Sequence, residues 1–204
     1  MQIAHGQFAL KPPTFLLNGN LTKSGNLHPY LPNTCILTYR ILASLIAENL
    51  HCYLPFTGGS TKLICEAKGN RTLHVFDTFE GLPDLSSEDN KNRFYMGQYS
   101  SSFEDVKNYL KKYQNIYFYK GLFPFSAEPV KNNKFSFVHL DVDLYEATLA
   151  SLKFFYQRMN KGGIIISHDY IEVPGVRKAF DEFFKDKPEP IIELSGTQCL
   201  ISKL

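Results

Sequence analysis

Two short apolar segments, each followed by ionisable residues, constrain the fold of this chain more than any other feature. Residues 135–146 hold Phe-Ser-Phe-Val-His-Leu before Asp141, and residues 162–170 hold Gly-Gly-Ile-Ile-Ile-Ser before His168 and Asp169. Apolar runs of this length, rich in Val, Ile and Phe, are typical of buried strands. The sequence therefore predicts two buried strands that deliver polar ligands at their ends.

The segment between these strands predicts a helix. Residues 144–159 carry apolar side chains at helical spacing, and Asn-Lys-Gly-Gly at 160–163 would supply C-cap glycines. A strand-helix-strand unit has parallel strands and a right-handed crossover. Because ligands bind beyond the carboxyl ends of parallel strands, Asp141, His168 and Asp169 should face one crevice.

The rest of the chain alternates between strand and helix patterns. We expect strands at 51–56, 72–77, 116–120, 190–194 and 198–201, and helices at 38–49, 62–68, 102–113 and 173–185. Pro55 weakens the first of these strands, since proline cannot donate to a central ladder. Residues 195–197 (Ser-Gly-Thr) predict a hairpin between the last two. This order indicates an α/β fold: a mostly parallel sheet with helices on both faces and a C-terminal antiparallel hairpin.

Length and composition limit the classes of function. The 204 residues suit one domain, 35–204, preceded by an irregular arm at 1–34 that is rich in Pro, Asn and Gly. A net charge of +2 with scattered basic residues argues against nucleic-acid binding. Four cysteines without a CxxC pair, and no leader or apolar span of about 20 residues, predict a cytoplasmic protein without a membrane segment.

A glycine turn and a carboxylate suggest a small-molecule site. Gly-Gly-Ser-Thr at 58–61 opens a predicted helix, where backbone N–H groups can approach an anion or a cofactor, although a plain tight turn fits equally well. Asp77 ends a predicted strand about 20 residues later, the spacing at which nucleotide-binding sheets place an acid on ribose hydroxyls. A helix N-cap or a solvated strand end fits Asp77 as well.

At five ordered motifs the chain resembles the macrocin O-methyltransferase family, whose members use S-adenosylmethionine. The motifs span roughly residues 57–204 and are 58–61, 75–83, 140–146, the pair 162–163 with 168–170, and 174–177. The resemblance implies a Rossmann-like class I methyltransferase sheet with the methyl donor over the glycine turn. It also implies a divalent metal, usually magnesium, and a small-molecule hydroxyl acceptor of the sugar or natural-product kind.

The same resemblance implies roles for individual residues. Asp141, His168 and Asp169 would hold the metal (Mg or Mn), and Asp141 would also be the catalytic base. The expected donor-binding residues are Gly58, Gly59, Ser60, Asp77, Thr78 and Gly121. We expect Asp143 to cap the following helix, and His74 and His139 to be core residues. An N-terminal arm of this kind can pack on a neighbouring subunit, so a homo-oligomer is one possible state of the protein.

Two departures from the family pattern bear on function. His168 stands where the family often has an acid, and imidazole suits manganese, iron or zinc better than magnesium. Cys52 and Leu54 stand where the family carries an acid and a glycine that help to hold the donor. The second departure supports an alternative, a catalytically impaired relative that acts as a binding or scaffold protein. A nicotinamide-dependent enzyme is disfavoured by the lack of a full GxGxxG motif.

Overall fold

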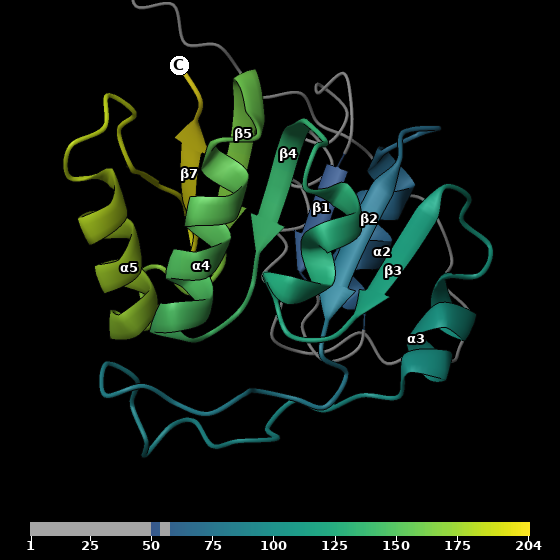
Figure 1. Ribbon diagram of the computed structural model, residues 1–204, viewed down its shortest axis with the longest axis horizontal. Coiled ribbons are helices and arrows are strands. Elements are labelled where there is room, and N and C mark those ends of the chain that lie inside the picture. Colours follow the sequence, from purple (N-terminus) through teal and green to yellow (C-terminus); the bar gives the residue numbers. More distant parts are fainter. Residues whose placement is uncertain (1–49, 54–57) are drawn as a thin grey trace, which may run out of the picture. The chain divides into compact units, whose positions relative to one another are not determined.

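The computed structural model describes residues 50–53 and 58–204, and all structural statements below concern these residues. They form one seven-stranded sheet with the order β3-β2-β1-β4-β5-β7-β6 (Figure 1). The strands are β1 (Leu50–Tyr53), β2 (Leu73–Asp77), β3 (Ile116–Lys120), β4 (Phe135–Leu140), β5 (Met159–Ser167), β6 (Ile192–Glu193) and β7 (Cys199–Ser202). Strands β1 to β5 are parallel, and β7 pairs antiparallel with both β5 and β6. The predicted α/β architecture with a C-terminal antiparallel hairpin is confirmed.

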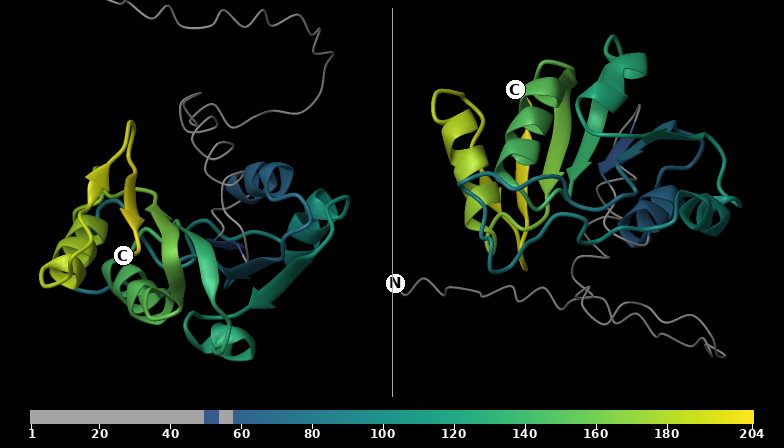
Figure 2. Two further views of the ribbon diagram at one scale, coloured as in Figure 1. Left: turned by 90° about the horizontal axis from the view of Figure 1, so that it is seen from above. Right: turned by 60° about the horizontal axis from the view of Figure 1, so that its bottom comes forward.

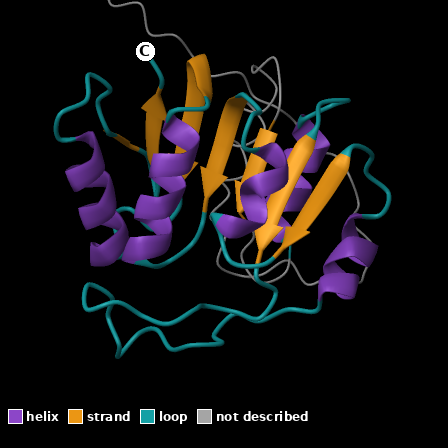
Figure 3. Ribbon diagram, in the orientation of Figure 1, coloured by secondary structure: helices purple, strands orange, loops and turns teal. Residues whose placement is uncertain are grey.

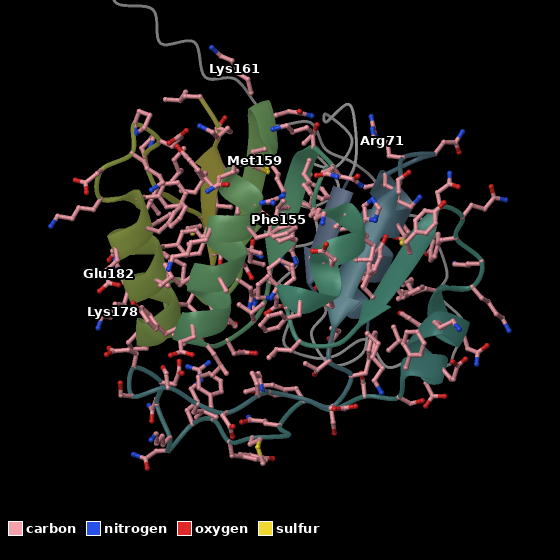
Figure 4. All side chains as sticks on the ribbon, in the orientation of Figure 1. Arg71, Phe155, Met159, Lys161, Lys178 and Glu182 are labelled. Carbon is pink, nitrogen blue, oxygen red and sulfur yellow. The ribbon has the colours of Figure 1, made fainter. Side chains whose placement is uncertain are left out.

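Helices cover both faces of the sheet. They are α2 (Gly59–Ala67), α3 (Phe103–Leu110), the 3-10 helix η1 (Phe125–Val130), α4 (Tyr145–Tyr156) and α5 (Pro174–Phe184). Helices α4 and α5 lie on one face with η1, and α2 lies on the other (Figure 2). Neighbouring residues of a strand point to opposite faces, so Phe76 packs in the α4 and α5 core and Val75 in the α2 and α3 core. Phe155 and Met159 lie between α4 and the sheet (Figure 4).

Strand β4 occupies the middle of the sheet, where both faces are covered. All six of its residues are buried, so apolar side chains point to both faces and only Ser136 and His139 are polar. His139 in β4 and His74 in β2 are buried as expected, and His74 Nδ1 lies 3.0 Å from the Tyr119 hydroxyl. Both histidines are therefore parts of the core.

The prediction that residues 160–163 form a helical C-cap is wrong. Helix α4 ends at Tyr156, and these four residues belong to β5. Phe135 pairs with Met159 and Phe137 with Ile164, so an advance of two residues on β4 matches five on β5. The glycines serve this bulge instead: Gly162 has φ +77°, and a Cβ on Gly163 would lie 2.8 Å from the Asn160 carbonyl oxygen.

Several other boundaries can be compared with the prediction. Helix α3 stops at Leu110 rather than 113. Ser102 caps its start, since Ser102 Oγ accepts a hydrogen bond from Asp105 N at 3.2 Å. Strand β1 is central, and the remainder of its predicted range, including Leu54 and Pro55, lies outside the described residues. So do the predicted arm at 1–34 and the helix at 38–49. Among the described helices, none is both long and apolar enough to cross a bilayer.

Candidate active site

The predicted ligands gather at the carboxyl edge of the parallel strands. Asp77 is the last residue of β2, Asp141 follows β4 directly, and His168 follows β5 directly. Because these strands run in the same direction, their ends lie along one edge of the sheet (Figure 1). The chain turns sharply after each of them: Phe79, Asp143 and Asp169 have φ values of 58°, 58° and 60°. Left-handed backbone at residues other than glycine is strained, and it concentrates at functional sites.

Asp141, His168 and Asp169 form a compact cluster. Each offers one ligand atom, and these atoms lie within 4.8 Å of one another. His168 Nδ1 is 2.8 Å from Asp169 Oδ2 and 3.4 Å from Asp141 Oδ1. Despite these distances, the buried Nδ1 atom makes no hydrogen bond of acceptable geometry. A buried nitrogen beside two carboxylates without a hydrogen bond fits a site that holds a cation.

The electrostatics of the cluster agree with that assignment. Burial opposes a charge on His168, but Asp141 and Asp169 together raise the pKa of the imidazole to about 11. Burial likewise opposes ionisation of Asp141, and the nearby His168 nevertheless lowers the pKa of its carboxyl. Without a metal, the imidazolium thus supplies the positive charge that the carboxylates need. A divalent cation can replace that proton, since two carboxylates and a neutral imidazole are a common donor set.

The prediction that Asp143 caps the following helix is wrong. The N-cap residue of α4 is Leu144, whose side chain makes no capping hydrogen bond. Asp89 does so from the long loop, because its Oδ1 accepts a hydrogen bond from Tyr145 N at 2.8 Å. Asp143 lies instead with the acid cluster: burial, Asp141 and Asp169 raise the pKa of its carboxyl well above the ordinary value.

Asp77 and Gly121 lie together on the β2 side of the edge. Gly121 N donates to the Asp77 carbonyl oxygen at 2.9 Å, and Asp77 Oδ1 accepts from Phe79 N at 2.6 Å. Burial raises the pKa of the Asp77 carboxyl to about 6, although the hydrogen bond from Phe79 opposes the shift. The Thr78 hydroxyl donates to the Gly81 carbonyl oxygen at 2.7 Å, so it already serves the turn that leaves β2.

The glycine turn opens α2 as predicted. Gly58 is the N-cap residue with φ +74°, Gly59 begins the helix, and Ser60 is buried. A Cβ on Gly58 would keep ordinary contact distances, so the left-handed backbone rather than crowding favours glycine here. The turn follows β1, the neighbour of β2, so it opens at the same edge as Asp77. The N–H groups of Gly59 and Ser60, at the start of this helix, are suited to a polar ligand.

A long loop, residues 78–102, crosses this edge below α4 and α5 (Figure 3). Its two ends pair with each other, since Leu82 N donates to Gln98 O at 2.8 Å and Gly97 N to Leu82 O at 2.9 Å. Phe94 is buried in the α4 and α5 core, and Asp89 ties the loop to the start of α4. We call this segment the crossing loop. Sequence reasoning missed Asp89, because its partner Tyr145 is 56 residues away.

Comparison with known proteins places the chain in a family. Residues 59–200 match the macrocin O-methyltransferase (TylF) family. The chain is 27% identical over 124 residues to demethyldecarbamoylnovobiocin O-methyltransferase of Streptomyces niveus, covering 56% of this chain and 47% of that protein. It is 27% identical over 157 residues to 8-demethyl-8-(2,3-dimethoxy-alpha-L-rhamnosyl)-tetracenomycin-C 4'-O-methyltransferase of Streptomyces olivaceus, covering 69% and 60%. The chain therefore spans about half to three fifths of the length of these relatives.

Solved structures agree with the fold. The O-methyltransferase NovP superposes with a TM-score of 0.73 at 22% identity, covering 87% of this chain and 83% of that one. The calicheamicin methyltransferase CalS11 gives a TM-score of 0.70 at 18% identity, covering 82% and 77%. The predicted Rossmann-like methyltransferase sheet is thus confirmed. Since the family pattern matches well over half of its residues, this chain belongs to the macrocin O-methyltransferase family.

Proposed function

We propose that the chain is an S-adenosylmethionine-dependent, divalent-metal-assisted O-methyltransferase that acts on a hydroxyl of a sugar or natural-product-like small molecule. The observation that carries this proposal is the cluster of Asp141, His168 and Asp169 at the same sheet edge as Asp77. Membership of the family supports it, and so do the names of two relatives, which are O-methyltransferases of a rhamnosyl tetracenomycin and of demethyldecarbamoylnovobiocin. Structural neighbours crystallised with S-adenosylhomocysteine support a donor site on this fold.

The residues divide the work of the proposed reaction. When bound, the metal would lower the pKa of an acceptor hydroxyl, and the donor would supply an electrophilic methyl group on its sulfonium. Asp141, His168 and Asp169 would hold the metal, and a carboxylate oxygen of Asp141 would accept the hydroxyl proton. Asp77 would accept hydrogen bonds from the donor ribose. Backbone N–H groups of the turn at 58–60, with Gly121 beside Asp77, would line the donor site.

Donor binding tests the proposal directly. We expect S-adenosylmethionine and its demethylated product to bind with micromolar affinity, and Asp77→Ala to weaken both by about 10- to 100-fold, because hydrogen bonds to a charged group contribute about 1.5–3 kcal/mol. Calorimetric titration with and without Mg²⁺ or Mn²⁺ measures this. Asp77→Asn keeps an oxygen that can accept the hydrogen bond from Phe79 N, so this variant should stay folded and any loss of donor affinity reflects the lost charge. Asp105→Ala removes a carboxylate from an exposed position on α3 and should leave affinity unchanged.

The same titration decides between the proposal and its rivals. If neither compound binds under any metal condition, the methyltransferase assignment fails, and the scaffold alternative suggested by Cys52 and Leu54 takes its place. A change in the absorbance of a nicotinamide cofactor on mixing would instead favour an oxidoreductase on the same sheet.

His168 leads to a prediction about the metal. We expect Mn²⁺ to bind at least about tenfold more tightly than Mg²⁺, because an imidazole nitrogen suits Mn²⁺ better than the harder Mg²⁺. His168→Asp should narrow that preference, and His168→Ala should weaken both ions. Electron paramagnetic resonance of free Mn²⁺, with Mg²⁺ as competitor, gives both affinities without any turnover. Equal affinities of the wild type for the two ions would show that His168 is not a ligand.

A further inference from the structure

Exposed apolar side chains lie on the crossing loop and on the segment that directly follows Asp169. Tyr95, Met96 and Tyr99, on the crossing loop, are 66%, 67% and 42% exposed, and Ile171, two residues after Asp169, is 39% exposed. We call these four residues the apolar rim. Exposed large apolar groups that lie together mark ligand or partner sites, whereas isolated ones are common.

Contacts between the crossing loop and the β5–α5 connection bring the two parts of the rim together. Arg93 donates to the Glu172 carbonyl oxygen at 3.4 Å and lies 3.9 Å from its carboxylate. Phe94 is 2% exposed and packs in the same core cluster as Tyr170 and Val173, which flank Ile171. The residues on either side of these anchors are therefore held next to each other.

Within two residues of Tyr99 the crossing loop returns to the end of β2. The Tyr99 φ of +66° is left-handed, and two residues later Ser101 N donates to Phe79 O at 3.3 Å, close to the end of β2. Burial and the carboxylates of Asp143 and Asp169 raise the pKa of the Tyr99 hydroxyl, which agrees with a ring lying near the acid cluster. A strained backbone of this kind persists where the surrounding structure holds a side chain in a working position.

The charges around the rim favour a neutral ligand. The two carboxylates of Asp141 and Asp169 would balance the charge of one bound divalent cation, so the cluster would offer no net positive charge to a phosphate on the acceptor. Three basic side chains tie the crossing loop to its neighbours, and all are paired: Arg93 with Glu172, Lys178 with Glu88 and Lys120 with Glu80. Lys178 lies on α5 facing the loop (Figure 4).

We propose that the apolar rim is the acceptor-binding surface, and that the Tyr99 ring packs against an apolar or aromatic face of a neutral acceptor whose hydroxyl then reaches Asp141, His168 and Asp169. Tyrosine rings offer a large apolar surface with little loss of side-chain entropy, and small-molecule sites combine such surfaces with a few polar groups. Tyr99 is then a specificity-determining residue. This inference rests on the proposed function and adds the surface that selects the acceptor.

Fluorescence tests the inference directly. The chain contains no tryptophan, so Tyr99→Trp places a single indole in the rim. With S-adenosylhomocysteine present, 4-nitrophenyl glycosides of several neutral hexoses should quench this indole saturably. The matched methyl glycosides, which lack the aryl face, should bind about tenfold more weakly, as expected when about 1.4 kcal/mol of aromatic packing is lost. A 6-phosphorylated nitrophenyl glycoside should bind more weakly than its neutral parent.

Two alanine variants distinguish a role of Tyr99 in acceptor binding from a general effect of removing an exposed ring. Calorimetry should show nitrophenyl glycoside binding weakened about tenfold by Tyr99→Ala and unchanged by Tyr117→Ala, which removes a similarly exposed ring from β3. S-adenosylhomocysteine should bind equally to all three proteins. If the donor product binds but no nitrophenyl glycoside quenches Trp fluorescence, or if Tyr99→Ala binds the glycosides as tightly as the wild type, the inference is overturned. Absence of donor binding would instead remove the proposed function and this inference with it.

Discussion

Asp141→Asn is expected to lower the rate of methyl transfer by about 10³-fold, within the range for loss of a general base combined with loss of a metal ligand. The asparagine has the same shape, but its amide carries no charge for a cation and cannot take a proton from a hydroxyl. Asp141 is also buried 3.4 Å from His168 Nδ1, so few other groups can replace it. Single-turnover transfer from radiolabelled donor, with Mn²⁺ affinity measured in parallel, provides two independent readouts.

A matched control is the same substitution at an exposed position. Asp186→Asn, just beyond α5, should leave both the rate and Mn²⁺ binding unchanged. Donor affinity should also be preserved in Asp141→Asn, since the donor-binding residues that we propose lie around the ends of β1, β2 and β3. Unaltered turnover and Mn²⁺ affinity in Asp141→Asn would reduce this carboxylate to a solvated strand end and withdraw its two proposed roles.

The position of the site at one edge of the sheet could be predicted from the sequence, because the central strands are buried. A strand covered on both faces cannot carry a charged side chain, so the first charge after an apolar run marks its end. Strand β4 ends at Leu140, directly before Asp141, as predicted. Because parallel strands end at one edge, the sequence also predicted that Asp141, His168 and Asp169 would be close together.

Features that depend on distant contacts were not predictable. Glycines at 162–163 have the same local pattern in a helical C-cap and in a bulge, and only the pairing of β5 with β4 decides between them. Asp143 occupies a natural capping position, yet Asp89 reaches the same helix from the crossing loop. Local sequence shows that a helix start needs an acceptor, but not which segment supplies it. The apolar rim could not be predicted either, because contacts between the crossing loop and the β5–α5 connection assemble it.

Asp89→Ala is expected to destabilise the protein by about 3 kcal/mol, because it removes three hydrogen bonds from a buried carboxylate and leaves their donors unsatisfied. Asp89 accepts from Ser86 N at 2.8 Å, from Ser86 Oγ at 2.6 Å and from Tyr145 N at 2.8 Å, and it is 8% exposed. Its charge also lies at the N-terminus of α4, where the helix dipole favours an anion. The melting temperature should fall by about 6–12 °C for a chain of this length, and urea unfolding measures the free energy directly.

Glu88→Ala is the matched control, because it shortens the neighbouring acid but breaks only an exposed ion pair with Lys178. Such pairs contribute little, so its unfolding midpoint should stay close to that of the wild type. Equal midpoints for the two variants would mean that Asp89 does not hold the crossing loop. If Asp89→Ala is the less stable, a second consequence follows, because the same loop carries Tyr99. Acceptor affinity should then fall in the folded Asp89→Ala protein. Donor affinity should be retained, because the donor site that we propose lies at Asp77 and the turn at Gly58.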